Sequence, residues 1–186
     1  MVLIFYITYL AWFMAEIFLN RYFRSGSEDI KDRDKGSLRI IWITIGMANS
    51  LALLSAIFIR FPVSSSAMLP YSGLFMILSG MVLRFFAIGT LGRFFTVDVT
   101  IRQGHSLKMD GLYRYIRHPS YSGMLISFYG FGLSLNNWLS LAFADIPVTM
   151  VMIYRINIEE RLLEKQFGDE YAAYKKRSWR LIPWIF

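Results

Sequence analysis

Residues 111–123 read GLYRYIRHPSYSG, a dense run of polar and aromatic side chains at the mouth of an apolar segment. Pro119 suits the first turn of a helix that begins there, because the N–H that proline lacks would have no helical partner at that position. Polar groups placed against lipid are costly and tend to be kept for function. The stretch therefore predicts the start of a membrane helix and a functional site beside it.

The rest of the chain is mostly apolar. Of its 186 residues 55% are hydrophobic, which is too many for an ordinary soluble domain. Five apolar runs occupy about 2–19, 40–59, 70–91, 120–135 and 138–158. A bilayer core asks for about 20 helical residues, so four runs are long enough, and the shorter fourth pairs with the fifth across Asn136-Asn137 as a helical hairpin. We predict an all-α fold: one domain, residues 1–186, forming an integral membrane bundle of five transmembrane helices.

Basic residues mark alternate connections between these runs. Residues 20–39, 92–119 and 155–186 are rich in lysine and arginine, whereas 60–69 carries only Arg60 and 136–137 carries none. This alternation follows the positive-inside rule. It predicts a multi-pass protein with its N-terminus outside and its C-terminus and residues 92–119 in the cytoplasm. The net charge of +7 then reflects orientation and contact with anionic headgroups rather than nucleic-acid binding. The first run, without a basic n-region or a cleavage site, is not expected to be a signal peptide.

Several chemistries are excluded by composition. The chain has no cysteine and two histidines, so we expect no disulfide, no thiolate catalysis and no metal site. No Gly-x-Gly-x-x-Gly follows a strand, and no polar stretch is long enough for a nucleotide-binding βαβ domain. A nucleotide-like cofactor would therefore be held by the membrane helices and their cytoplasmic extensions.

The segment 159–177 continues the fifth run with apolar residues at helical spacing. It predicts a helix that leaves the bilayer, breaks near Gly168 and continues from Asp169 as an amphipathic helix on the cytoplasmic surface.

A second polar cluster lies at the start of this extension. Arg155 and Glu159 are four residues apart and share one helix face, so they form either an intrahelical ion pair with a snorkelling arginine or part of a site. Three further charged residues fall within apolar runs, namely Glu16, Arg84 and Asp145. Unpaired charges are expensive there, so we expect a structural pair, with Asp145 or a lipid headgroup as the partner of Arg84 and with Glu16 simply hydrated.

Two separated motifs resemble the isoprenylcysteine carboxyl methyltransferase family, and related phospholipid methyltransferases share much of them. The motifs are Gly111-x-Tyr113-x-x-x-Arg117-His118-Pro119-x-Tyr121-x-Gly123 and Arg155-x-x-x-Glu159-Glu160-x-x-Leu163-x-x-x-Phe167-Gly168-Asp169-Glu170-Tyr171. The resemblance covers roughly residues 91–183, and the first three runs match only in hydropathy. Members of this family are integral membrane enzymes that bind S-adenosylmethionine in a cytoplasmic pocket and methylate a lipid-borne acceptor.

The resemblance implies a set of site residues. It makes Arg155 the catalytic and substrate-binding residue, which would grip an acceptor carboxylate. It assigns cofactor contacts to His105, Ser106, Leu107, Lys108, Tyr113, His118, Pro119, Ser120, Tyr121 and Glu159. A polar family position also falls on Asp98.

The implied function is O-methylation of the carboxylate of an isoprenylcysteine-like lipidic acceptor, with a lipid-modified or prenylated substrate and membrane lipids as partners. Three alternatives stay open. The first is N-methylation of a phospholipid or small lipid, which requires a base near the amine. The second is a membrane reductase that uses NADPH, since some sterol reductases look similar in their C-terminal halves. The third is a non-catalytic lipid-binding or scaffolding protein.

Overall fold

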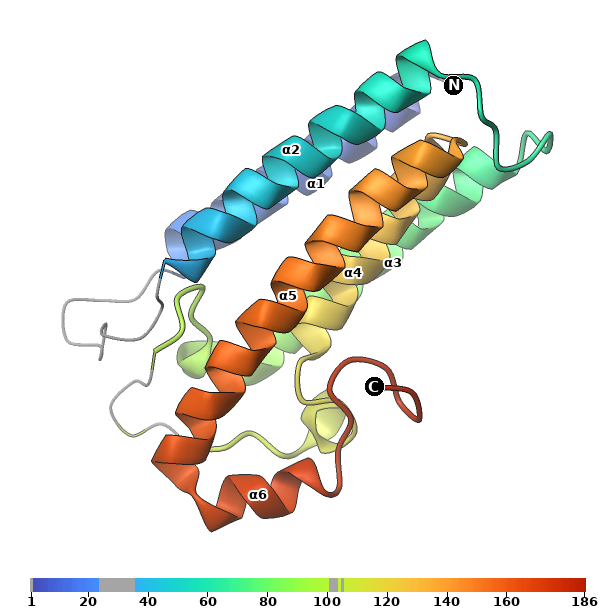
Figure 1. Cartoon of the computed structure of the whole chain (residues 1–186). Coiled ribbons are helices and arrows are strands. Elements are labelled where there is room, and N and C mark those ends of the chain that lie inside the picture. The colour runs from blue at the N-terminus through green and yellow to red at the C-terminus, as the bar shows by residue number, and fades with distance from the viewer. Residues whose placement is uncertain (1, 24–35, 101–103, 105) are drawn as a thin grey trace.

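The structure, a computed structural model, describes residues 2–23, 36–100, 104 and 106–186 (Figure 1). Throughout that part the regular elements are helices, which confirms the predicted all-α class. They are α1 (Val2–Tyr22), α2 (Ser37–Phe58), α3 (Leu69–Leu91), the short 3-10 helices η1 (Gly92–Phe94) and η2 (Gly111–Arg114), α4 (Pro119–Ser134), α5 (Trp138–Phe167) and α6 (Asp169–Lys175).

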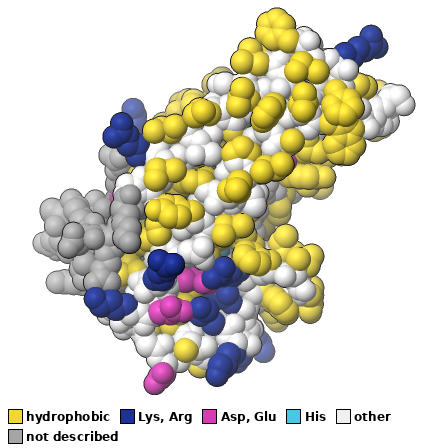
Figure 2. Space-filling view, viewed as in Figure 1, with side chains coloured by type: hydrophobic (Ala, Val, Ile, Leu, Met, Phe, Trp, Pro, Cys, Tyr) yellow, Lys and Arg dark blue, Asp and Glu magenta, His cyan; other side chains and the backbone are white. Residues whose placement is uncertain are grey.

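The helices α1, α2, α3 and α5 are long and apolar enough to cross a membrane. Together with α4 they form an elongated bundle. On the face shown in Figure 2, hydrophobic side chains cover most of its length and most charged side chains gather at one end. α4 has 16 residues, or about 24 Å of helix, so its role as a fifth span stays a prediction.

α3 and α4 pack backbone to backbone along one side of the bundle. At Gly80 a Cβ would meet the carbonyl oxygen of Gly123 at 2.5 Å, and at Gly73 it would meet that of Gly130 at 2.6 Å. Small residues permit this close approach between helices in a membrane. The pairing fixes the start of α4, and with it His118, against the end of α3.

The predicted hairpin between α4 and α5 is present. Asn136 adopts a positive φ of 46°, and the side chain of Asn137 accepts hydrogen bonds from the first backbone N–H groups of α5. The amide of Asn137 also donates to the carbonyl oxygen of Ile59 at 2.6 Å, which ties this turn to the end of α2.

α5 extends beyond the bundle and ends before Gly168, whose φ of 50° turns the chain into α6. The predicted break is therefore confirmed. α6 has only seven residues and buries Tyr171 and Tyr174 within the protein, so in the structure its apolar face packs inward. After α6 the chain returns to the start of α4, where Trp179 forms a parallel β-bridge with Ile116.

Candidate functional site

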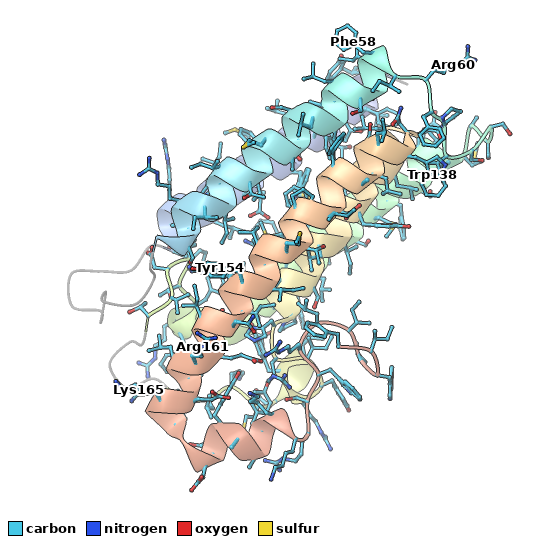
Figure 3. The ribbon with its side chains drawn as sticks, viewed as in Figure 1. Phe58, Arg60, Trp138, Tyr154, Arg161 and Lys165 are labelled. Atoms are coloured by element: carbon cyan, nitrogen blue, oxygen red, sulfur yellow. The ribbon has the colours of Figure 1, made fainter. Side chains whose placement is uncertain are left out.

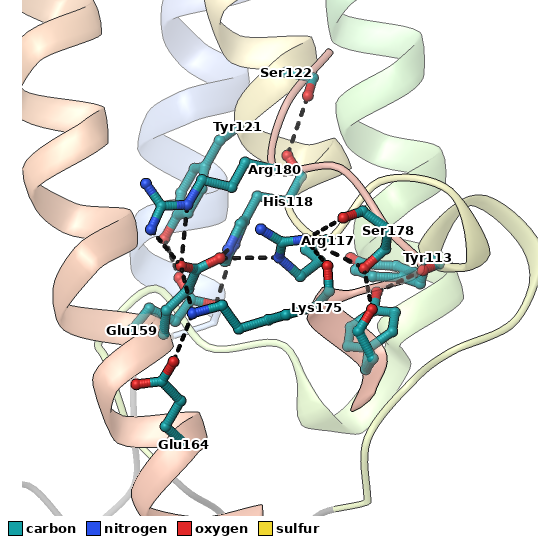
Figure 4. A network of polar contacts seen from close by, with 12 residues as sticks. Tyr113, Arg117, His118, Tyr121, Ser122, Glu159, Glu164, Lys175, Ser178 and Arg180 are labelled. Carbon is teal, nitrogen blue, oxygen red and sulfur yellow. Dashed lines mark hydrogen bonds and ion pairs between the residues drawn. The ribbon is translucent and has the colours of Figure 1, made fainter. Parts of the chain in front are cut away.

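An open cavity of about 860 Å³ lies at the charged end of the bundle. Its walls come from the end of α3, the segments 94–100 and 107–108, η2, the start of α4, the extension of α5 and α6. The two polar clusters singled out in the sequence meet here, although they belong to different helices (Figure 4).

Most of the site residues expected from the resemblance line this cavity. They are Asp98, Leu107, Lys108, Tyr113, His118, Ser120, Tyr121, Arg155 and Glu159. Pro119 is buried at the start of α4 and Ser106 is exposed, and neither is among the lining residues. His105 lies outside the described residues. The ammonium of Lys108 lies 2.9 Å from Asp110 Oδ1.

His118, Tyr121 and Glu159 form the polar centre of the site. The Tyr121 hydroxyl donates to Glu159 Oε2 at 2.9 Å, and His118 Nδ1 lies 3.8 Å from Glu159 Oε1. The rings of His118 and Tyr121 stack with their centroids 5.7 Å apart. The His118 side chain is buried, whereas the Glu159 side chain is about one third exposed, so Glu159 keeps access to a ligand.

Glu160 has a different task from its neighbour. It is buried and accepts from Arg117 Nε at 2.9 Å and from Arg180 Nη2 at 2.6 Å. Its Oε1 also lies 3.4 Å from His118 Nε2. A buried carboxylate needs such partners to offset its desolvation. Glu160 thus joins α5, the turn before α4 and the C-terminal segment. Figure 4 shows its partners Arg117 and Arg180.

Arg155 is 2% exposed and lines two cavities. Its guanidinium donates to the Ser37 hydroxyl and to the carbonyl oxygen of Val97. The second cavity, of about 490 Å³, lies among α1, α2, α4 and α5 and has mostly apolar walls. The two cavities share Phe95, Thr96, Tyr121 and Arg155. Arg155 therefore lies where the cavity that holds the His118–Tyr121–Glu159 centre meets a more apolar cavity that reaches between the long helices.

The sequence assigned the wrong partner to Arg84. Its guanidinium contacts Glu16 with Nε–Oε1 at 2.8 Å and Nη2–Oε2 at 3.0 Å, and it also donates to the Ser120 hydroxyl at 3.0 Å. Glu16 is thus an ion-pair partner rather than a hydrated side chain, and Asp145 does not supply this pair. Which acid pairs with Arg84 depends on the depth and rotation of the helices, and hydropathy alone does not give these. The pair joins α1 to α3, and both of its residues line the second cavity.

Three tyrosines lie in the cavity wall: Tyr113 was predicted as a site residue, whereas Tyr171 and Tyr174 were not. Burial raises the pKa of Tyr113 and Tyr171 and raises that of Tyr174 to about 12, so all three keep their phenolic protons at neutral pH. Tyr174 donates to the carbonyl oxygen of Tyr113, whereas the buried Tyr171 hydroxyl has no hydrogen-bond partner among the described residues. The spacing Tyr171-x-x-Tyr174 indicated a common helix face, but not that this face would line the cavity.

Comparisons with known proteins agree with this geometry. A model of the isoprenylcysteine carboxyl methyltransferase (ICMT) family matches residues 73–165, half of the chain, and this range includes both polar clusters. The chain is 41% identical over 115 residues to protein-S-isoprenylcysteine O-methyltransferase B of Arabidopsis thaliana, which covers 61% of this chain and 58% of that protein. It is also 40% identical over 74 residues to methanethiol S-methyltransferase 1 of Bradyrhizobium diazoefficiens, covering 39% of this chain and 25% of that protein.

A solved structure of the eukaryotic intramembrane Ras methyltransferase ICMT shares the fold. The TM-score is 0.66 at 28% identity, over 79% of this chain and 53% of that one. The chain thus spans little more than half the length of these isoprenylcysteine methyltransferase relatives.

Proposed function

Because the chain belongs to the isoprenylcysteine carboxyl methyltransferase family, we propose that it is a membrane methyltransferase that uses S-adenosylmethionine to methylate the carboxylate of an isoprenylcysteine-like lipid. The observation that carries this proposal is the position of Arg155, at the junction of the cavity that holds the polar centre and a more apolar cavity. A transfer between a water-soluble donor and a lipid acceptor requires two such compartments to meet at one point.

The cavity at the charged end fits the proposed cofactor in the polar and aromatic groups of its wall. Glu159 offers a partly exposed carboxylate that would accept hydrogen bonds from a ribose or an ammonium group. Tyr113 and Tyr121 offer aromatic faces, which attract cationic groups. The unpartnered Tyr171 hydroxyl offers a further hydrogen-bonding group in the wall. When bound, S-adenosylmethionine supplies an electrophilic methyl group carried on a sulfonium.

The chain's own residues would then act by alignment. The guanidinium of Arg155 is suited to a carboxylate, because its planar fork makes two parallel hydrogen bonds with it. A carboxylate is already ionised at neutral pH, so the acceptor needs no general base. Orientation of the two reactants can contribute about 7–11 kcal/mol in favourable cases. The second cavity would hold the lipid chain between α1, α2 and α5.

The alternatives fit this site less well. An amine acceptor must lose a proton, whereas a carboxylate acceptor is already ionised at neutral pH. A reductase would need to bind a nicotinamide cofactor. A scaffold would not need a carboxylate and a guanidinium in the walls of a polar cavity.

The proposal includes the membrane topology. We place α1 to α5 as five spans with the N-terminus outside, which puts the polar cavity, α6 and the C-terminal segment at the cytoplasmic face. α4 is short, but it packs between α3 and α5, so its ends are sheltered by protein. The basic residues at the cavity end of the bundle (Figure 2) support this orientation.

Calorimetric titration of the purified full chain in detergent tests the cofactor, with S-adenosylhomocysteine and NADPH as ligands. We expect binding of S-adenosylhomocysteine alone, whereas binding of NADPH alone would reject the methyltransferase. Transfer assays with a farnesylcysteine analogue, phosphatidylethanolamine and a small thiol then identify the acceptor. Methylation of the amine or the thiol, without the carboxylate, would overturn the acceptor proposed here.

A further inference from the structure

The C-terminal segment 178–186 presents an apolar surface that the site does not use. Ile182 is 52% exposed, Ile185 is 75% exposed and Trp184 is 83% exposed. Leu181, between them and the protein, is buried. Exposed apolar clusters of this kind mark interaction surfaces.

This surface belongs to a closed turn rather than to a loose end. The backbone N–H groups of Leu181 and Ile182 donate to the carbonyl oxygen of Phe186 at 2.8 and 3.0 Å. In return, the N–H of Phe186 donates to the carbonyl oxygen of Ile182 at 3.0 Å. Trp184 stands at the tip with a positive φ of 64°. We call residues 181–186 the apolar hook. Its fold turns three large side chains outward together.

The depth of the hook along the bundle is fixed by the first turn of α4. Ser122 donates from its hydroxyl to the carbonyl oxygen of Leu181 at 2.7 Å, and Ser122 is the fourth residue of that helix. In Figure 1 the C-terminal segment turns back from α6 toward the bundle, and in Figure 2 apolar side chains project there beside the charged end. The hook therefore continues the apolar surface of the bundle at the level where the charged end begins.

We propose that the apolar hook docks into the headgroup region of the lipid bilayer and acts as an interfacial anchor. Tryptophan favours this region because its ring is apolar and its N–H is polar. Lys176 and Arg177, both exposed just before the hook, add attraction to anionic headgroups. The bilayer is the occupant that this position favours, because the surface is continuous with the lipid-facing side of the helices.

The anchor holds part of the site. The N–H of Arg117 donates to the carbonyl oxygen of Trp179 at 2.7 Å, and the N–H of His118 donates to the carbonyl oxygen of Arg180 at 3.0 Å. The segment that carries the hook thus fixes the backbone from which His118 enters the cavity. We call residues 178–180, which carry the hook, the strap. Docking of the hook on the bilayer would keep the strap in place against residues 117–118.

Fluorescence quenching of the full chain in nanodiscs tests the docking. The contribution of Trp184 is the difference between the chain and its W184F variant, and W138F gives the same difference for a tryptophan at the other end of the bundle (Figure 3). We expect Trp184 to be quenched by lipids brominated near the headgroup more than by lipids brominated deep in the chain, and only weakly by aqueous iodide. Strong iodide quenching without bromolipid quenching would overturn the proposal, as would protection from both, which indicates a protein partner.

Hydrogen exchange tests the link to the site without reference to methyl transfer. In nanodiscs, a variant with Ile182→Ser, Trp184→Ser and Ile185→Ser should exchange the amides of Arg117 and His118 at least several-fold faster. Phe58→Ser, an exposed apolar residue at the opposite end, is the matched control and should leave them unchanged. Equal exchange in the triple variant and the unchanged chain would show that the hook does not hold the strap.

Discussion

His118 Nδ1 lies 3.8 Å from Glu159 Oε1, which brings the N-cap residue of α4 and a side chain of α5 to one side of the same cavity. Tyr121 shares the contact through its hydrogen bond to Glu159. The two motifs separated in the sequence thus form one polar centre. Substitutions in this polar centre and its surroundings can therefore test the contribution of each residue to cofactor binding, methyl transfer and stability.

Glu159→Gln should weaken S-adenosylhomocysteine binding while leaving the fold intact. The amide can still accept from Tyr121 but no longer offers a charge to the ligand. Hydrogen bonds to charged groups contribute about 1.5–3 kcal/mol, so we expect a loss of roughly 10- to 150-fold in affinity by calorimetry. Glu164→Gln, on the exposed side of the same helix, is the control. Unchanged affinity in Glu159→Gln would remove Glu159 from the cofactor site.

Arg155→Lys should impair transfer rather than cofactor binding. Lysine keeps the positive charge but cannot make the two parallel hydrogen bonds of a guanidinium. A misplaced acceptor can reduce the rate about 10²-fold, so we expect that order of loss in kcat/KM with a carboxylate acceptor. Titration with S-adenosylhomocysteine should stay close to normal. If cofactor affinity fell in parallel with turnover, Arg155 would have a role other than the one proposed.

Glu160→Gln should destabilise the protein. The substitution leaves the buried side chain of Arg117, and with it Arg180, without a counter-charge. Breaking a buried ion pair costs about 3–5 kcal/mol, so thermal unfolding in detergent should occur at a clearly lower temperature. Glu170→Gln, at an exposed position of α6, should behave like the unchanged chain. A normal unfolding temperature for Glu160→Gln would show that this network contributes little.

Ile45→Trp should obstruct the second cavity, which Ile45 lines. We expect a higher KM for an acceptor with a long lipid chain, little change for a short-chain analogue, and normal S-adenosylhomocysteine affinity. Overpacking also costs about 1–3 kcal/mol of stability. Ile43→Trp on the outer face of the same helix controls for the added ring. Equal KM changes for long and short acceptors would argue against a lipid chain in this cavity.

Alkaline pH should destabilise the fold through the buried tyrosines. Their pKa values are higher in the folded protein than the usual value near 10, to about 12 for Tyr174. The stabilisation from burying neutral phenols is therefore complete below pH ~10 and is lost as the pH rises toward 12. Melting temperatures measured across this interval should fall.

Tyr171→Phe should reduce the fall in melting temperature at alkaline pH. The phenylalanine cannot ionise, and it removes a buried hydroxyl that has no partner in the described part of the chain. We therefore expect unfolding at neutral pH to be unchanged or to require a higher temperature. A decline in alkali as steep as in the unchanged chain would mean that Tyr171 does not contribute to it.

The sequence determined the helical class and most element boundaries. Apolar runs and breakers such as Gly168 act locally, so α1, α2, α3 and α5 could be located without tertiary information. The paired Asn136-Asn137 indicated the α4–α5 hairpin for the same reason. The motifs also pointed to residues that line the cavity, because His118 and Glu159 belong to patterns within single helical segments.

The tertiary structure decided which distant groups meet. Arg84 contacts Glu16 rather than Asp145, Glu160 holds the C-terminal segment, and Tyr171 faces the cavity. Each of these contacts depends on the depth and rotation of one helix relative to another. Hydropathy gives the lipid-facing character of a helix but not its rotation against its neighbours. Side-chain packing, such as the close approach of α3 and α4 at Gly80 and Gly123, determines that rotation and thereby the geometry of the site.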